Sequence, residues 1–170
     1  MNIITSTYSS PCGDLILGSF GDSLCLCDWA INNSRRDAIV KRIETELKAK
    51  LCPGDSECNH QAKKQLDKFF AGRRKQFELP LKLIGTDFQK SVWLALQDIP
   101  FGSTISYAEL SLRIGRAKAY RAVASANRAN AISIIIPCHR VIGKNNELAG
   151  YAGGLPAKKY LIDLEKKLTQ

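Results

Sequence analysis

The hydrophobic pattern of this chain changes its period near residue 85, and that change most constrains the fold. Before it, two strand-like apolar runs at 15–17 and 24–27 are followed by segments with helical spacing. After it, the signals that begin α-helices follow one another closely. The sequence therefore predicts an α/β domain over 1–84 and a mainly α-helical domain over 85–170.

Helical spacing in the first domain predicts two helices. The first begins at a capping box formed by Ser34 and Asp37, and the Cys-Pro-Gly segment at 52–54 should end it. The second spans about 59–71, and residues 77–84 should be extended. This half of the chain contains no recognisable catalytic motif.

Two capping boxes mark helix starts in the second domain. Thr86 pairs with Gln89, and Ser106 pairs with Glu109, each just before an apolar run of helical period. The second of these helices closes at Gly115.

An alanine-rich helix over 117–128 follows Gly115 after a tight turn. Two short helices joined in this way fit a helix-turn-helix, although an ordinary helical hairpin has the same pattern. Pro156 at a first helical position should begin the last helix.

A thiol and an imidazole stand side by side after the apolar run at 134–136. Pro137 ends that run, and Cys138 and His139 follow it directly. A thiol reacts as its thiolate, so a nucleophilic cysteine needs a nearby base or positive charge. Free cysteine is also among the most buried residue types. Spacing alone leaves Cys138 open between a core residue and a nucleophile.

Positive charge is concentrated in the second domain. The chain has a net charge of +9, and no acidic residue lies between Glu109 and Glu147. The acid-free interval contains basic residues throughout: Arg113, Arg116, Lys118, Arg121, Arg128, Arg140 and Lys144. Such a segment is typical of a surface that faces phosphates, and a solvated basic face is the alternative.

The composition indicates where the protein is located and whether it binds a metal. No apolar run approaches the roughly 20 residues of a membrane span, and the N-terminus lacks a signal-peptide pattern, so we expect a cytoplasmic protein without membrane contact. The six cysteines should therefore be reduced. Cys52, Cys58 and His60 lack metal-ligand spacing and a fourth ligand, so we expect no metal.

Several segments of the second domain resemble one known family in both order and spacing. They are GTDFQKSVW at 85–93, ISYAEL at 105–110, RAV at 121–123, Asn130, IPCHRV at 136–141 and GYAGGL at 150–155. The chain resembles the O6-alkylguanine-DNA alkyltransferases, also called methylated-DNA–protein-cysteine methyltransferases. The resemblance implies a ribonuclease H-like sheet with helices in 1–84. It implies a winged-helix-like helix-turn-helix in the DNA-binding and alkyltransferase domain, 85–170.

The resemblance also implies a reaction. Cys138 would take the alkyl group from O6 of guanine, and by analogy from O4 of thymine, and keep it as a thioether. Each molecule then acts once, and no cofactor is needed because the damaged base is the alkyl donor. His139 is implied as the base, Glu165 as the group that orients it, and Asn130 as the residue that orders the turn. Tyr107 would donate toward the leaving base.

Further roles follow from the same resemblance. The protein would bind, as a monomer, double-stranded DNA that carries O6-alkylguanine, and it would contact this DNA through the minor groove. The DNA of the nucleoid would be its substrate. Arg121 would replace the flipped nucleotide, although a phosphate contact is the commoner role for arginine. Tyr107 and small or basic neighbours would also face DNA: Lys118, Ala122 and Arg128.

The pocket for the alkylated base is implied at Pro137, Val141, Tyr151 and Ala152. Many relatives have serine at the position of Ala152, but the implied contact there is a backbone N–H, which alanine keeps.

Three alternatives remain from other classes of protein. A non-catalytic protein that recognises alkylated bases would lack the reactive cysteine. A helix-turn-helix regulator would need an effector or dimer element, and none is found. A Cys-His hydrolase would turn over repeatedly and would not need the basic helix.

Overall fold

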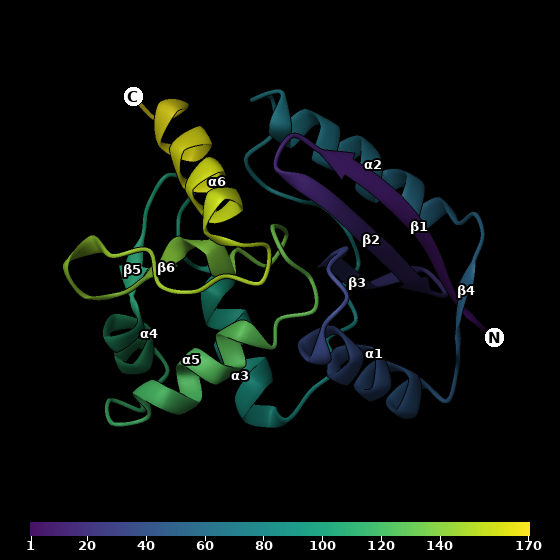
Figure 1. Ribbon diagram of the computed structural model, residues 1–170, viewed down its shortest axis with the longest axis horizontal. Coiled ribbons are helices and arrows are strands. Elements are labelled where there is room, and N and C mark those ends of the chain that lie inside the picture. The colour runs from purple at the N-terminus through teal and green to yellow at the C-terminus, as the bar shows by residue number, and fades with distance from the viewer. The chain divides into compact units, whose positions relative to one another are not determined.

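The computed structural model describes residues 1–170 and divides them into two compact units, Met1–Gly85 and Thr86–Gln170. The first unit holds a sheet with two helices, and the second is mainly helical (Figure 1). This confirms the two-domain architecture expected from the sequence. No helix is long and apolar enough to cross a membrane.

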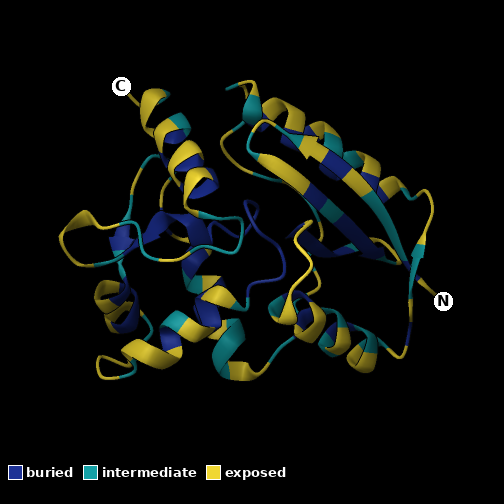
Figure 2. Cartoon of the chain, viewed as in Figure 1, coloured by how far each residue is buried: buried dark blue, intermediate teal, exposed yellow.

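The sheet of the first unit has the strand order β3-β2-β1-β4. Its antiparallel part consists of β1 (Ile3–Ser10), β2 (Gly13–Phe20) and β3 (Ser23–Trp29), and the short β4 (Leu51–Pro53) pairs parallel to β1. Leu15 and Leu17 of β2 are fully buried, and every residue of β3 after Ser23 is buried, so β3 is covered on both of its faces (Figure 2).

Two helices complete the hydrophobic core of the first unit: α1 (Ser34–Leu47) and α2 (Glu57–Phe70). Fully buried apolar side chains come from both layers. They are Ile3, Leu15, Leu17, Leu24 and Leu26 from the sheet, and Ile39, Ile43, Leu66 and Phe69 from the helices.

The predicted start of α1 is wrong by one residue. Asn33, not Ser34, is the N-cap, because its extended backbone lets its side chain accept from the backbone N–H of Arg36. The helix ends at Leu47, where Lys48 adopts the left-handed conformation. The Cys-Pro-Gly segment therefore does not end this helix; most of it lies in β4.

The other predictions for this unit hold with small shifts. The second helix begins at Glu57, two residues earlier than expected, since Ser56 caps it. Residues 77–84 contribute only an isolated bridge: Leu24 donates to the carbonyl of Pro80 and accepts from the N–H of Lys82. Pro80 cannot donate in a ladder, which limits this pairing.

The second unit begins with α3 (Asp87–Gln97) and two shorter helices, α4 (Tyr107–Arg113) and α5 (Tyr120–Arg128). The Thr86–Gln89 capping box is present in full, and Ser106 caps α4. The indole N–H of Trp93 donates to the carbonyl of Ala126 at 2.8 Å and so ties α3 to α5.

The alanine-rich helix is shorter than predicted. It begins at Tyr120 rather than at 117, because residues 117–119 offer no capping side chain and form a turn closed by a bond from the N–H of Ala119 to the carbonyl of Arg116. The chain then makes a single 3-10 turn, η1 (Cys138–Arg140). It continues through β6 (Val141–Ile142), which pairs parallel with β5 (Ile105–Ser106), and through the 3-10 turn η2 (Lys144–Asn146). The last helix, α6 (Leu155–Lys167), carries Pro156 in its first turn as expected.

Candidate active site

A buried turn between α5 and η1 positions Cys138. Asn130 is fully enclosed, and its side chain bridges the turn by accepting from the N–H of Ile132 at 3.0 Å and donating to the carbonyl of Ile136 at 2.9 Å. Ile134 has a φ of 72°, which a β-branched residue adopts only at a cost of about 1–3 kcal/mol. The hydrogen bonds of Asn130 hold the chain in this strained conformation, and Cys138 lies at the end of the turn.

Cys138 begins η1 and is only 4% exposed. Its N–H donates to the carbonyl of Ile136, and its own carbonyl accepts from the side-chain amide of Asn127 at 3.5 Å. These two hydrogen bonds fix the backbone of Cys138 at both its N–H and its carbonyl group. Burial alone makes a thiol less acidic, so a reactive Cys138 needs a base beside it.

His139 and Glu165 form a fully buried pair. The imidazole Nε2 lies 2.7 Å from Glu165 Oε2, and the two residues are 0% and 1% exposed. Burial lowers the pKa of His139 below its ordinary value and outweighs the opposing charge of Glu165, so the imidazole is neutral. An ionised carboxylate accepts only, so the proton of a neutral His139 lies on Nε2 and Nδ1 keeps its lone pair. No group in the structure is hydrogen-bonded to Nδ1, which leaves it free to act as a base.

Arg140 keeps Glu165 ionised. Its Nε and Nη2 atoms donate to the two carboxylate oxygens at 2.8 and 3.0 Å, and Nη1 donates to the carbonyl of Ile99 at 2.7 Å. Burial raises the pKa of Glu165, but the interactions with His139 and Arg140 outweigh it and lower that pKa to about 2. The sequence analysis counted Arg140 among the basic residues and within the IPCHRV motif but gave it no role of its own, so this structural role was missed.

Lys158 is a second residue that the sequence did not single out. Its ammonium is 0% exposed and donates to the carbonyl of Ala149 at 2.9 Å, just before the loop that contains Tyr151. Burial lowers its pKa to about 8, and the charge of Cys138 opposes that shift. The first turn of α6 therefore brings a buried cation to the neighbourhood of the thiol.

Tyr107 lies at the start of α4 and is buried. Burial raises the pKa of its phenol, and the charge of Cys138 raises it further, while a side-chain bond with Asn127 lowers it. Tyr107 and Cys138 are thus close enough to interact electrostatically. Asn127 contacts both residues, a role that its sequence position had not indicated.

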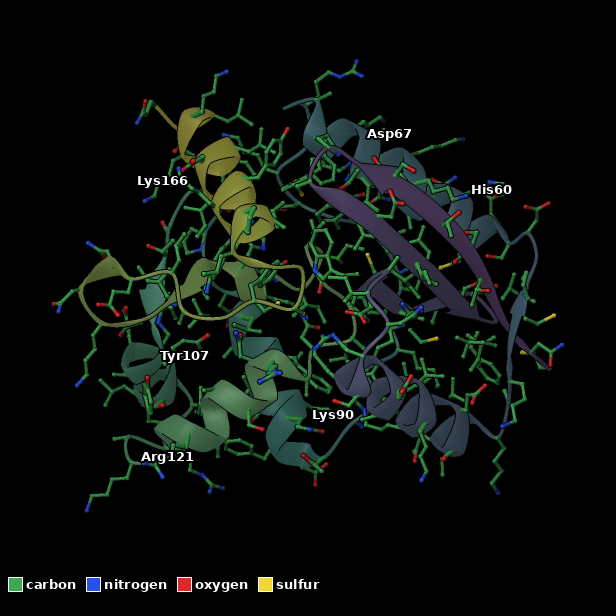
Figure 3. All side chains as sticks on the ribbon, in the orientation of Figure 1. His60, Asp67, Lys90, Tyr107, Arg121 and Lys166 are labelled. Atoms are coloured by element: carbon green, nitrogen blue, oxygen red, sulfur yellow. The ribbon has the colours of Figure 1, made fainter.

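Apart from Tyr107, the residues expected to face DNA do not join this buried cluster. Arg121 and Ala122 are exposed in the first turn of α5, Arg128 is exposed in its last turn, and Lys118 lies in the preceding turn. Figure 3 shows Arg121 projecting outward from the start of α5. Arg116 and Lys118 line a surface depression of about 480 Å³.

The expected pocket residues lie on both sides of Cys138 in the chain. Pro137 and Val141 are buried next to it, and Tyr151 and Ala152 are half-buried in the loop before α6. No group of three or more histidine, cysteine or acidic residues could hold a metal ion, and Cys52, Cys58 and His60 do not form one.

Two family models together match almost the whole chain. One, described as "6-O-methylguanine DNA methyltransferase, DNA binding domain", matches residues 87–167, and the other, its "ribonuclease-like domain", matches residues 3–83. The chain belongs to the 6-O-methylguanine DNA methyltransferase family. The resemblance seen in the sequence is thereby confirmed.

Individual members of this methyltransferase family match over nearly their full length. The constitutive methylated-DNA–protein-cysteine methyltransferase of Bacillus subtilis is 50% identical over 98% of this chain and 96% of that protein. The enzyme of that name from Methanosarcina acetivorans is 40% identical over 93% and 95%. The crystal structure of Mycobacterium tuberculosis OGT in complex with DNA aligns with a TM-score of 0.83 and 40% identity, covering 98% of this chain and 94% of that chain.

Proposed function

We propose that this protein repairs DNA by direct reversal, transferring the alkyl group from O6 of guanine to its own Cys138. The observation that carries the proposal is the buried Cys138–His139–Glu165 arrangement, with the imidazole proton held on Nε2 by Glu165 at 2.7 Å. This leaves Nδ1 as the basic atom of the residue that follows Cys138 in the chain, in a family whose named members are cysteine methyltransferases.

The transfer proceeds as one displacement at the alkyl carbon. His139 takes the Cys138 proton through a water, and the sulfur then forms a bond to carbon while the bond from carbon to O6 breaks. Tyr107 donates toward N3 of the leaving guanine, which offsets the charge left on the base, and the proton held by His139 restores the phenol. A thioether is a poor leaving group, so each molecule acts once.

The same proposal assigns the remaining residues to binding. The chain acts as a cytoplasmic monomer on nucleoid DNA, with domain 85–170 contacting the minor groove. Lys118, Ala122 and Arg128 face the duplex, and Arg121 enters the stack in place of the flipped guanine. The extruded base lies against Pro137, Val141, Tyr151 and Ala152. O4-alkylthymine is a second substrate of the same pocket.

A duplex with a radiolabelled O6-methyl group on guanine tests this proposal. We expect the label to move to the protein, and we expect Cys138→Ser to bind the same duplex without taking up label. Label that stays in DNA despite tight binding by the unmodified protein would instead indicate a non-catalytic recognition protein. Release of labelled small molecules over many turnovers would indicate a hydrolase.

A further inference from the structure

Tyr120 presents a large aromatic ring at the first position of α5. Its side chain is 44% exposed, and four small residues lie near it in the chain: Ala117, Ala119, Ala122 and Ala124. A single exposed aromatic side chain is common on protein surfaces and needs no special explanation. Tyr120 differs from such a residue because of its two neighbours, Tyr107 and Arg121.

One neighbour of Tyr120 is the tyrosine of the active site. The rings of Tyr107 and Tyr120 meet edge to face, with centroids 6.0 Å apart and planes at 81°. This is a favoured aromatic geometry, and it restricts rotation of the Tyr107 ring. Tyr120 also contributes to the raised pKa of the Tyr107 phenol, after burial and the charge of Cys138. Tyr120 is therefore in contact with Tyr107, the residue proposed to donate a proton to the leaving guanine.

The other neighbour is Arg121, the next residue along α5, which is also exposed. The buried side of α5 is formed by Val123, Ala126 and Asn127; the helical repeat places Arg121 on the opposite side and Tyr120 at the border between the two sides. Proteins that bind the minor groove commonly place apolar or aromatic side chains against the sugars and bases where the duplex is distorted. The exposed part of the Tyr120 ring has the chemistry for such a contact.

We propose that Tyr120 is a positioning residue for alkyl transfer in duplex DNA. Its buried edge braces Tyr107 against the extruded base, and its exposed edge packs in the minor groove beside the nucleotide that flanks the extruded one. The inference rests on the proposed function and adds to it a residue that couples groove contact to the geometry of the active site. The aromatic ring carries both contacts, and the hydroxyl group is not required.

Single-turnover transfer of label to Cys138 tests this role with Tyr120→Ala, Tyr120→Phe and a matched control, Tyr160→Ala. Tyr160 is a similarly exposed tyrosine, 38% accessible, on α6. We expect Tyr120→Ala to lower the transfer rate at saturating duplex on the order of tenfold and to weaken duplex binding. Tyr120→Phe should keep nearly the full rate, and Tyr160→Ala should match the unmodified protein.

An assay with free O6-alkylguanine base distinguishes the contact of Tyr120 with Tyr107 from its contact with the groove. Because the base alone meets Tyr107 but no groove, Tyr120→Ala should lose less activity on it than on duplex. An equal loss on both substrates would overturn the groove contact, and failure of Tyr120→Phe to keep the rate would overturn the role of the ring.

An unchanged duplex rate in Tyr120→Ala would overturn the inference while leaving the proposed function intact, provided that the unmodified protein transfers label. Absence of transfer in the unmodified protein would overturn both. A circular dichroism melt of each variant checks folding, and Tyr120→Leu supplies a second non-aromatic variant if Tyr120→Ala unfolds.

Discussion

Replacing Glu165 by glutamine should destabilise the protein strongly, because the carboxylate holds two buried partners. It accepts from His139 at 2.7 Å and from two nitrogens of Arg140 at 2.8 and 3.0 Å. Glutamine has a similar shape but offers one acceptor oxygen and an NH2 group that faces donors. The guanidinium of Arg140, itself buried, is then left without its counter-charge.

The magnitude follows from the shift in pKa. The pKa of Glu165 falls from 4.5 to about 2, since His139 and Arg140 outweigh the effect of burial. At about 1.4 kcal/mol per pKa unit, ionised Glu165 contributes about 3 kcal/mol to the free energy of unfolding. The folded pKa lies below the unfolded one, so this contribution is complete above pH 4.5 and is lost as the pH falls toward 2.

Urea unfolding of the unmodified protein and Glu165→Gln over a range of pH measures this contribution. We expect the variant to be less stable by about 3 kcal/mol near neutral pH, with the difference shrinking below about pH 4. Asp163→Asn is the control on the same helix: Asp163 is exposed and pairs only with Lys159, so its loss should cost under about 0.5 kcal/mol. A Glu165→Gln difference under about 1 kcal/mol, or one that does not change with pH, would refute the reasoning.

Two further changes test the surroundings of Cys138. Asn130→Ala removes the bonds to Ile132 and Ile136, so we expect a loss of about 2–3 kcal/mol in urea unfolding and slower label transfer; unchanged values of both would show that the turn holds itself. Burial lowers the pKa of Lys158 to about 8, so the folded protein releases this proton before the unfolded chain does. The stability of the unmodified protein should therefore rise relative to Lys158→Met between about pH 8 and 10, and parallel pH profiles would contradict the buried charge.

Elements specified by neighbouring residues could be predicted from the sequence. Thr86 and Ser106 cap their helices because each side chain reaches an N–H three residues ahead. At α1 both Asn33 and Ser34 are good caps, and only the backbone conformation chooses between them. β1 was missed because most of it is polar and only Ile3 and Tyr8 are buried. The three-residue β4 is specified by pairing with β1, which is a contact distant in sequence.

The same distinction between interactions of neighbouring residues and interactions distant in sequence applies to the active site. The resemblance led to Cys138, His139 and Glu165, and the structure places the last two in direct contact. The sequence could not separate Lys158 from Lys159, which are adjacent lysines on one helix. Folding buries the first completely and leaves the second exposed in a pair with Asp163. Arg140 was likewise counted with the basic surface, because its bond to Glu165 spans 25 residues.

The most direct test of the account is a titration of the protein with increasing amounts of methylated duplex, followed by mass spectrometry of its peptides. We predict one methyl group per protein molecule, located on Cys138, with uptake reaching a plateau however much duplex is added. Methyl groups on another cysteine, or guanine restored in amounts well above the amount of protein, would contradict a Cys138 nucleophile that is used once.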